Sequence, residues 1–180
     1  MFDKEFKDFV LQAGLVLGLI YGIISFGTYF MGLEAMVSIW TIVISLGIGI
    51  GAPVYYGVRW KQFKGGVLDF KQAFAVIFLV YALSSLISTI FSYTLNTIID
   101  PELPEALYQE SLKFTVQIME SVGAPEAQID EALDQIRAEK EVYGLSAELK
   151  HYFSGLIFGA VIAVIGGAII KKSPDVFEQS

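Results

Sequence analysis

The chain has 180 residues, of which 54 % are hydrophobic and 17 % charged, with a mean hydropathy of +0.60 and a net charge of −7. Soluble domains average about 45–50 % apolar and about 25 % charged residues, so this composition excludes an ordinary soluble enzyme and a disordered chain. The net negative charge offers no basic surface, and we expect no nucleic-acid partner. Without cysteine there is no disulfide, thiolate nucleophile or cysteine metal site.

The apolar residues are concentrated in four windows that contain no Asp, Glu, Lys or Arg. At about 1.5 Å per helical residue each window reaches roughly 28 Å or more, enough to cross a hydrocarbon core of about 30 Å. In lipid every backbone N–H and C=O needs an internal partner, so each span is helical. The fold class is therefore an all-α, four-helix transmembrane bundle in one membrane domain, residues 1–180. The expected spans are 9–33, 35–58, 72–99 and 147–170.

The orientation follows from the basic residues. Eight of the twelve Lys and Arg residues lie in the N-terminal stub, the 59–71 connection and the C-terminal tail, which four spans place on one side. Because short basic segments stay on the cytoplasmic side, both termini are expected in the cytoplasm.

The long segment between spans three and four is expected on the opposite side. Between Asp100 and Lys150 it holds twelve acids and four bases, a net charge of −8. Apolar residues at helical spacing predict two amphipathic helices in an acidic insertion, residues 100–146. The first helix is expected to end at Gly123, and Ser146 is expected to cap the fourth span. The two apolar stripes comprise Leu107, Phe114 and Ile118, and Ile129, Leu133 and Ile136.

Small residues recur one turn apart in every span. Since no hydrophobic force drives helices together in lipid, such ridges allow close backbone approach. We expect them at helix crossings in a compact bundle with little interior volume, with Leu17 on a lipid-facing side. The predicted packing residues are Gly14, Gly18, Gly22, Gly47, Gly51, Ser84, Ser88, Ser92, Gly155, Gly159 and Ala163.

The third span is the most polar, and five of its side chains share one helical face: Tyr81, Ser85, Ser88, Ser92 and Asn96. One interpretation is a hydrated cavity or a binding groove. The other, which we favour at this point, is a packing seam with interhelical hydrogen bonds.

The connection between spans two and three alternates basic and aromatic residues. Contact with anionic lipid is one interpretation, and anchoring at the membrane boundary is the other. Asp69 followed by Gln72 predicts the start of the third helix. The four candidate lipid-contacting residues are Arg59, Lys61, Lys64 and Lys71.

No catalytic, cofactor-binding or metal-binding residues are predicted, and we expect a protein that is not an enzyme. His151 is the only histidine, and it follows Glu148 by three residues. Glu-x-x-His is a di-iron bundle spacing, but those sites use two such motifs, so His151 is expected to anchor at the interface.

Two stretches of the chain are similar to a known family: RWKQFKGGVLDFKQAF at 59–74 and IDPE at 99–102. The chain resembles the small Bacteroidota membrane proteins catalogued as domain of unknown function 4199. The resemblance implies a multi-pass protein of the bacterial inner membrane with residues 100–150 in the periplasm, and it implies no activity, substrate or cofactor.

Three functions remain open. The first is a non-enzymatic membrane protein that binds a protein partner or a second copy of itself through the periplasmic helices, with membrane lipid around its spans. The second is a small permease that uses the polar face of the third span. The third is a membrane-embedded enzyme acting on lipid, although no acid–base pair is visible for it.

Overall fold

The computed structural model describes residues 3–138, 140 and 143–172. Within them, four helices are long and apolar enough to cross a membrane, which confirms the predicted fold class. These are α1 (Lys4–Met31), α3 (Ile39–Phe63), α4 (Phe70–Tyr93, continued by a π-helical turn, Thr94–Ile99) and α7 (Leu145–Ile170). A short helix, α2 (Leu33–Val37), joins α1 to α3.

Side-chain caps fix where two of these helices begin. The Asp3 carboxylate accepts the N–H of Phe6 at 2.8 Å at the start of α1. The Asp69 carboxylate accepts the N–H of Gln72 at 2.7 Å at the start of α4, as the sequence predicted. Both bonds satisfy an N–H that has no partner within its own helix.

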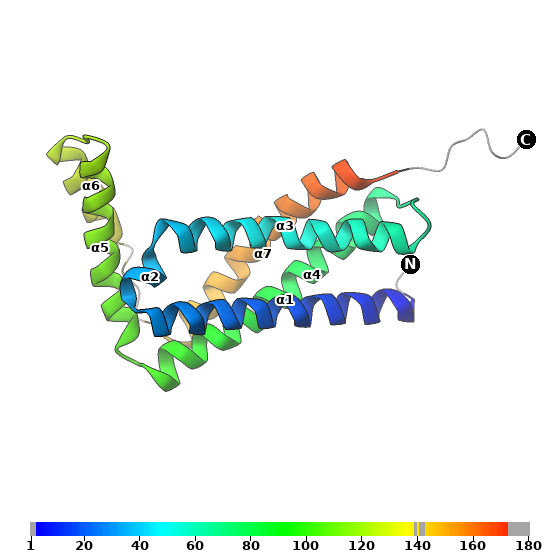
Figure 1. Cartoon of the computed structure of the whole chain (residues 1–180), viewed down its shortest axis with the longest axis horizontal. Coiled ribbons are helices and arrows are strands. Elements are labelled where there is room, and N and C mark those ends of the chain that lie inside the picture. The colour runs from blue at the N-terminus through cyan, green and yellow to red at the C-terminus, as the bar shows by residue number, and fades with distance from the viewer. Residues whose placement is uncertain (1–2, 139, 141–142, 173–180) are drawn as a thin grey trace, which may run out of the picture.

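Helices α5 (Leu103–Ser121) and α6 (Glu126–Ala138) occupy the insertion and lie across one end of the bundle (Figure 1). Gly123, at φ +73°, follows α5 as expected for a helix stop. The expected cap at Ser146 is wrong: the cap position is Gly144, two residues earlier, and α7 begins at Leu145.

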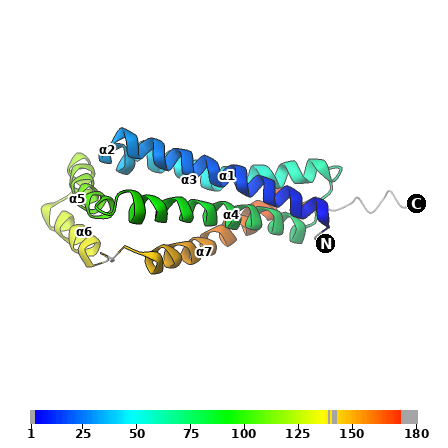
Figure 2. The same ribbon diagram turned by 90° about the horizontal axis from the view of Figure 1, so that it is seen from below.

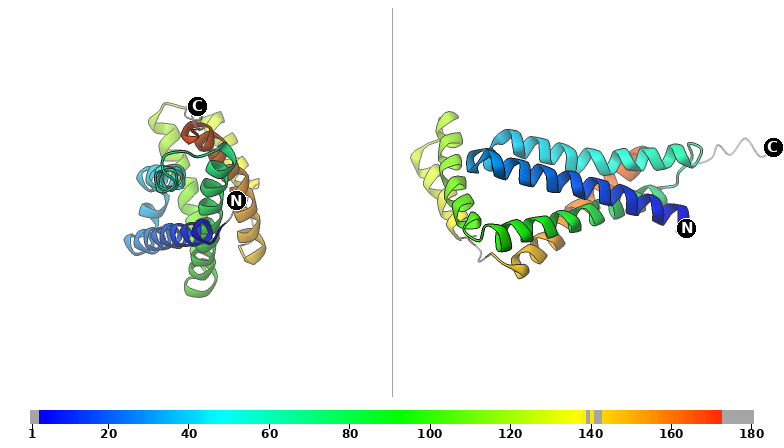
Figure 3. Two further views of the ribbon diagram at one scale, coloured as in Figure 1. Left: turned by 90° about the vertical axis from the view of Figure 1, so that its right-hand side faces the viewer. Right: turned by 60° about the horizontal axis from the view of Figure 1, so that its bottom comes forward.

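The two ends of the bundle differ. The insertion end carries α2, α5 and α6, whereas the terminal end carries the start of α1, the end of α7 and the α3–α4 connection (Figure 2). Helix α4 is central and packs against α1, α3 and α7. Helix α3 is the most loosely held span, since 11 % of its most apolar window is buried, against 28 to 33 % for the other three. Towards the insertion end, α3 diverges from α4 and α7 (Figure 3, right), whereas α1 stays against α4, where Tyr29 Oη donates to Asp100 Oδ2 at 3.1 Å.

The terminal end is closed by packed side chains. Trp60 of α3 is buried against Phe6 and Phe9 of α1, with ring centroids 5.3 and 5.0 Å apart. The backbone of Leu68 pairs with that of Lys172 through two hydrogen bonds, so the end of the described chain is held against the α3–α4 connection.

Candidate functional site

A cavity of about 660 Å³ lies between α3, α4 and α7, with one side chain from α1, Tyr21, reaching it. It is partly open to the surroundings of the bundle and lies beside the packed core, a space that the expectation of little interior volume did not include. Hydroxyl groups dominate its polar lining. They belong to Tyr21, Thr41, Ser45, Tyr81, Ser84, Ser85, Ser88, Thr89, Ser92, Tyr143 and Tyr152.

The polar face of α4 forms one wall of this cavity. Of its five predicted residues, Tyr81, Ser85, Ser88 and Ser92 line the cavity, whereas Asn96 is buried beside it. The hydroxyl of Ser85 donates to the carbonyl of Ala82, within the same helix, at 3.1 Å. A self-satisfied hydroxyl of this kind does not hold a neighbouring helix.

Interhelical hydrogen bonds are therefore sparse along this face. Ser92 Oγ donates to Glu148 Oε1 of α7 at 2.7 Å. Tyr152 Oη donates to the carbonyl of Ala82 at 3.4 Å. The packing-seam interpretation holds at the Ser92 end of the face, and the cavity interpretation describes the rest.

The floor of the cavity lies towards the terminal end, where the helices close on one another. A Cβ added to Gly57 of α3 would come within 2.8 Å of both Ile77 of α4 and Ile170 of α7. The ammonium of Lys61 donates to the carbonyl of Ile170 at 2.6 Å, which caps the last turn of α7. The cavity is thus closed at one end of the spans and flanked by the insertion at the other.

The glycines of α1 form a groove for α4. Cβ atoms added to Gly14, Gly18 and Gly22 would come within 2.6 to 2.7 Å of three α4 side chains, one per turn. The α4 partners, in the same order, are Leu83, Ile87 and Phe91. Because both series run in the same direction, α1 and α4 are parallel and closely packed.

Helix α7 packs on the same α4 through smaller side chains. The ring of Tyr81 lies directly on Gly159, leaving no room for a Cβ there. Ala163 is fully buried, and Ser84 of α4 is 1 % exposed. At Gly155 a Cβ would meet only the Tyr81 hydroxyl, at an ordinary 3.6 Å.

Two packing expectations are wrong. A Cβ at Gly47 or Gly51 of α3 would meet no described atom within 4 Å, because this half of α3 diverges from its neighbours. Leu17, expected to face lipid, is 1 % exposed, since it lies on the α1 face that carries the glycines.

A family model described as "Protein of unknown function (DUF4199)" matches residues 12–172, from the third turn of α1 onwards through all four spans. The chain belongs to this family. Searches of curated proteins and of solved structures gave no match. The DUF4199 description assigns no activity, so the function of the cavity has to be argued from its own residues.

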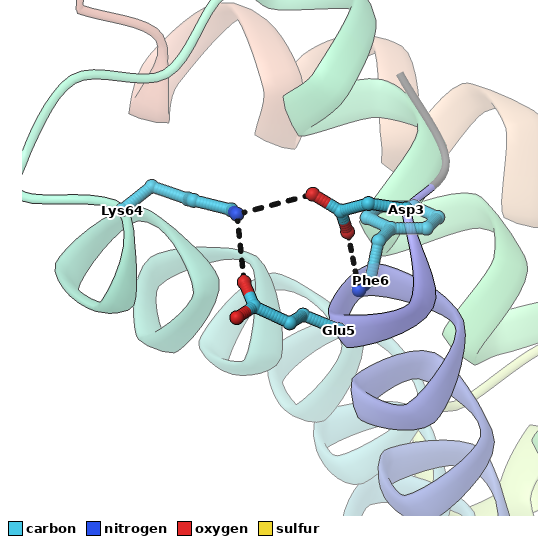
Figure 4. A network of polar contacts seen from close by, with 4 residues as sticks. All are labelled: Asp3, Glu5, Phe6 and Lys64. Carbon is cyan, nitrogen blue, oxygen red and sulfur yellow. Dashed lines mark hydrogen bonds and ion pairs between the residues drawn. The ribbon is translucent and has the colours of Figure 1, made fainter.

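Two of the four basic residues predicted to contact lipid, Lys61 and Lys64, instead bind other groups of this DUF4199 chain. Lys64 Nζ lies 3.4 Å from Asp3 Oδ2 and 3.3 Å from Glu5 Oε2 (Figure 4). The hydrogen bonds that the Lys64 ammonium donates to Glu5 and to Asp3 hold the pKa of Lys64 above its usual value. Lys61 caps α7 as described above, whereas Arg59 and Lys71 are exposed.

Many of the lining residues were not predicted as site residues, among them Thr41 and Ser45 of α3 and Glu148 of α7. The four-residue spacing of Thr41 and Ser45 was a usable signal for a polar face on span two. Glu148 was weighed only as half of a metal motif, because it lies one turn before the uncharged window of span four, residues 152–170. Among the described residues, no group of three or more His, Cys, Asp or Glu side chains could hold a metal ion.

Proposed function

We propose that this protein is a small membrane permease or solute-binding protein that takes a small polar ligand into the cavity between α3, α4 and α7. The observation that carries the proposal is the cavity wall. The hydroxyls of Ser85 and Ser88 face about 660 Å³ of space where a packed bundle would place another helix. Binding pockets combine an apolar wall with a few polar groups, and this cavity has both.

The closed terminal end supports binding from one side. Trp60, Ile77 and Leu68 are buried there, and Gly57 leaves no gap between the helices. A solute therefore enters from the insertion end or laterally past α3. The loosely held half of α3 is the element whose movement would change access to the cavity.

The test is a thermal-shift screen of the purified protein in nanodiscs against small cationic, neutral and anionic solutes. At least one class is expected to stabilise the parent protein, because a ligand that binds only the folded state raises its melting temperature. Ser88→Trp, which fills the cavity, is expected to abolish the shift.

The triple variant Ser85→Ala, Ser88→Ala, Ser92→Ala keeps the small side chains but removes three hydroxyls. It is expected to weaken binding, and proteoliposomes that carry it are expected to accumulate less of the labelled solute. A shift that survives in Ser88→Trp, or no shift with any class, contradicts the proposal.

We propose further that the protein lies in the bacterial inner membrane with both termini in the cytoplasm and the insertion in the periplasm. The distribution of basic residues supports this orientation. Because the chain has no cysteine, single cysteines at Lys64 and at Glu131 report the topology directly. In intact spheroplasts an impermeant maleimide is expected to label the Glu131 site but not the Lys64 site, and the reverse result inverts the orientation.

A protein partner or a second copy at α5 and α6 stays a prediction. The apolar side chains of α6, Ile129, Leu133 and Ile136, are all half-buried, so little apolar surface is left on that helix. The cavity is for this reason the better supported site.

A further inference from the structure

Among the described residues, Glu148 is the one carboxylate that lines the cavity. It lies in the first turn of α7, and the residue is 5 % exposed. Its Oε1 accepts from Ser92 Oγ at 2.7 Å and from Asn96 Nδ2 at 3.5 Å, both on the α4 side. Among the described residues no donor is recorded for its second oxygen, Oε2, and no buried side-chain oxygen is left unsatisfied. Oε2 is therefore open to the cavity.

The backbone of α4 changes where it meets Glu148. From Thr94 to Ile99 the helix widens into a π-helical turn, and Asn96 in this turn is 8 % exposed. Asn96 Nδ2 also donates to Ser92 Oγ at 3.1 Å, which orients that hydroxyl towards the carboxylate. Short π-helical segments are frequent at functional sites, and this one builds the support for Oε1.

The charges around the cavity favour a cation as the missing partner. Its described lining contains no Lys or Arg, and the titratable groups besides Glu148 are His151 and four tyrosines: Tyr21, Tyr81, Tyr143 and Tyr152. Glu148 lies at the N-terminus of α7 and accepts hydrogen bonds from two donors on the α4 side. A carboxylate removed from water still favours a positive partner.

The insertion strengthens this preference at the mouth. Between Asp100 and Lys150 the chain carries twelve acids and four bases. Clefts flanked by charge of one sign raise the local concentration of ligands of the other sign. The cavity is therefore approached through a field that attracts cations and repels anions.

We propose that the cavity recognises a small organic cation, whose ammonium group donates to Glu148 Oε2 while its body lies against Tyr81, Ser85 and Ser88. This inference rests on the proposed function and specifies its ligand class. Ser92 and Asn96 act as positioning residues, because they hold Oε1 and leave Oε2 for the ligand.

The experiment compares phenethylammonium with 2-phenylethanol, a neutral probe of nearly the same size. Calorimetry uses the full chain in nanodiscs of a neutral lipid at pH 7. The parent protein is expected to bind the ammonium probe at least about tenfold more tightly, since a buried charge partner contributes that much or more. Glu148→Gln, which keeps the size of the side chain, is expected to bind the two probes equally.

Two controls keep the outcomes distinct. Ser92→Ala retains the carboxylate but loses its support, so the preference is expected to fall without disappearing. Ser88→Trp, which fills the cavity, is expected to abolish the binding of both probes. Whether the parent protein binds phenethylammonium more tightly than 2-phenylethanol already tests the cation assignment. The test therefore does not depend on the folding of Glu148→Gln.

Equal binding of both probes by the parent, or a preference unchanged in Glu148→Gln, overturns the assignment of Glu148. If both probes still lose binding in Ser88→Trp, the proposed cavity function stands while the cation assignment falls. If neither probe binds but a neutral or anionic solute does in the broader screen, the cation assignment also falls. If no solute binds, both proposals fall.

Discussion

The two sides of α4 show how the same kind of residue produces opposite results. On the α1 side, Leu83, Ile87 and Phe91 fill a groove made by three glycines. On the α3 side, serines one turn apart face a cavity. Small residues permit close packing, but a partner side chain has to occupy the space they leave. Where α3 diverges, that partner is absent and the polar groups of α4 meet open volume.

The largest expected effect is at the α1–α4 contact. Gly18→Leu adds an isobutyl group where even a Cβ would come within 2.6 Å of Ile87. Overpacking costs about 1–3 kcal/mol, and the contact with a β-branched neighbour places this variant near the upper end. Membrane insertion is expected to be normal because leucine is favourable in a span. The measurement is thermal unfolding in detergent.

The matched control is Gly47→Leu on α3. The same side chain is added to the same residue type, but nothing described lies within 4 Å of its Cβ. Its melting temperature is expected to equal that of the parent. Equal melting of Gly18→Leu and Gly47→Leu would remove the distinction between the two sides of α4.

A smaller loss is expected from Leu17→Ala, on the same α1 face. Leu17 is 1 % exposed, so truncation leaves a gap beside α4. The span remains in lipid when the bundle comes apart, so the cost is lost packing alone, about 1–2 kcal/mol. Leu15→Ala is the control, because Leu15 is 44 % exposed and faces away from the bundle. If Leu17→Ala and Leu15→Ala unfold at the same temperature, Leu17 faces lipid and the expected packing against α4 is wrong.

On the cavity side, Ser88→Leu is expected to change stability by less than about 0.5 kcal/mol. The isobutyl group enters existing space, in contrast with Gly18→Leu on the opposite side of the same helix. Differential scanning fluorimetry of the two variants compares one added side chain in two environments. If Ser88→Leu loses as much stability as Gly18→Leu, the α3 side of α4 is packed as tightly as the α1 side.

The smallest effect concerns the ion pairs at the terminal end, all exposed. The N–H of Phe6 and the ammonium of Lys64 hold the pKa of Asp3 below its usual 3.8. Asp3 therefore adds stability above about pH 3.8, and this is lost as pH falls through its lower folded pKa. Lys64, whose pKa is raised above 10.5, adds stability below that pH, and this is lost as pH rises through its folded pKa.

Asp3→Asn keeps the helix cap but removes the charge. Its melting temperature is expected to lie slightly below the parent value from about pH 5 to 9, and the two values are expected to converge in acid. The emission of Trp60, which lies beside this cluster, provides the readout. A difference that persists unchanged at pH 2.5 would show that the ion pair is not its source.

Much of the fold could be predicted from the sequence because lipid leaves few alternatives. Uncharged windows fixed four helices, and the Asp69 cap placed the start of α4. The glycine spacing in α1 predicted a contact, but the same spacing at Gly47 and Gly51 did not, because spacing says nothing about the angle between helices. That angle also created the cavity, so the role of Ser88 could not be read from α4 alone. Glu148 was missed for a related reason, since its partners Ser92 and Asn96 lie about fifty residues away in the chain.

The central claim is that the hydroxyl face of α4 lines an accessible cavity while the neighbouring face is packed. Single cysteines test it directly in a chain that has none. With a small hydrophilic methanethiosulfonate reagent added from the insertion side, Ser88→Cys is expected to react and Ile87→Cys, one residue away against Gly18, is expected to stay unmodified. Modification of neither site, or of both at the same rate, would contradict the account.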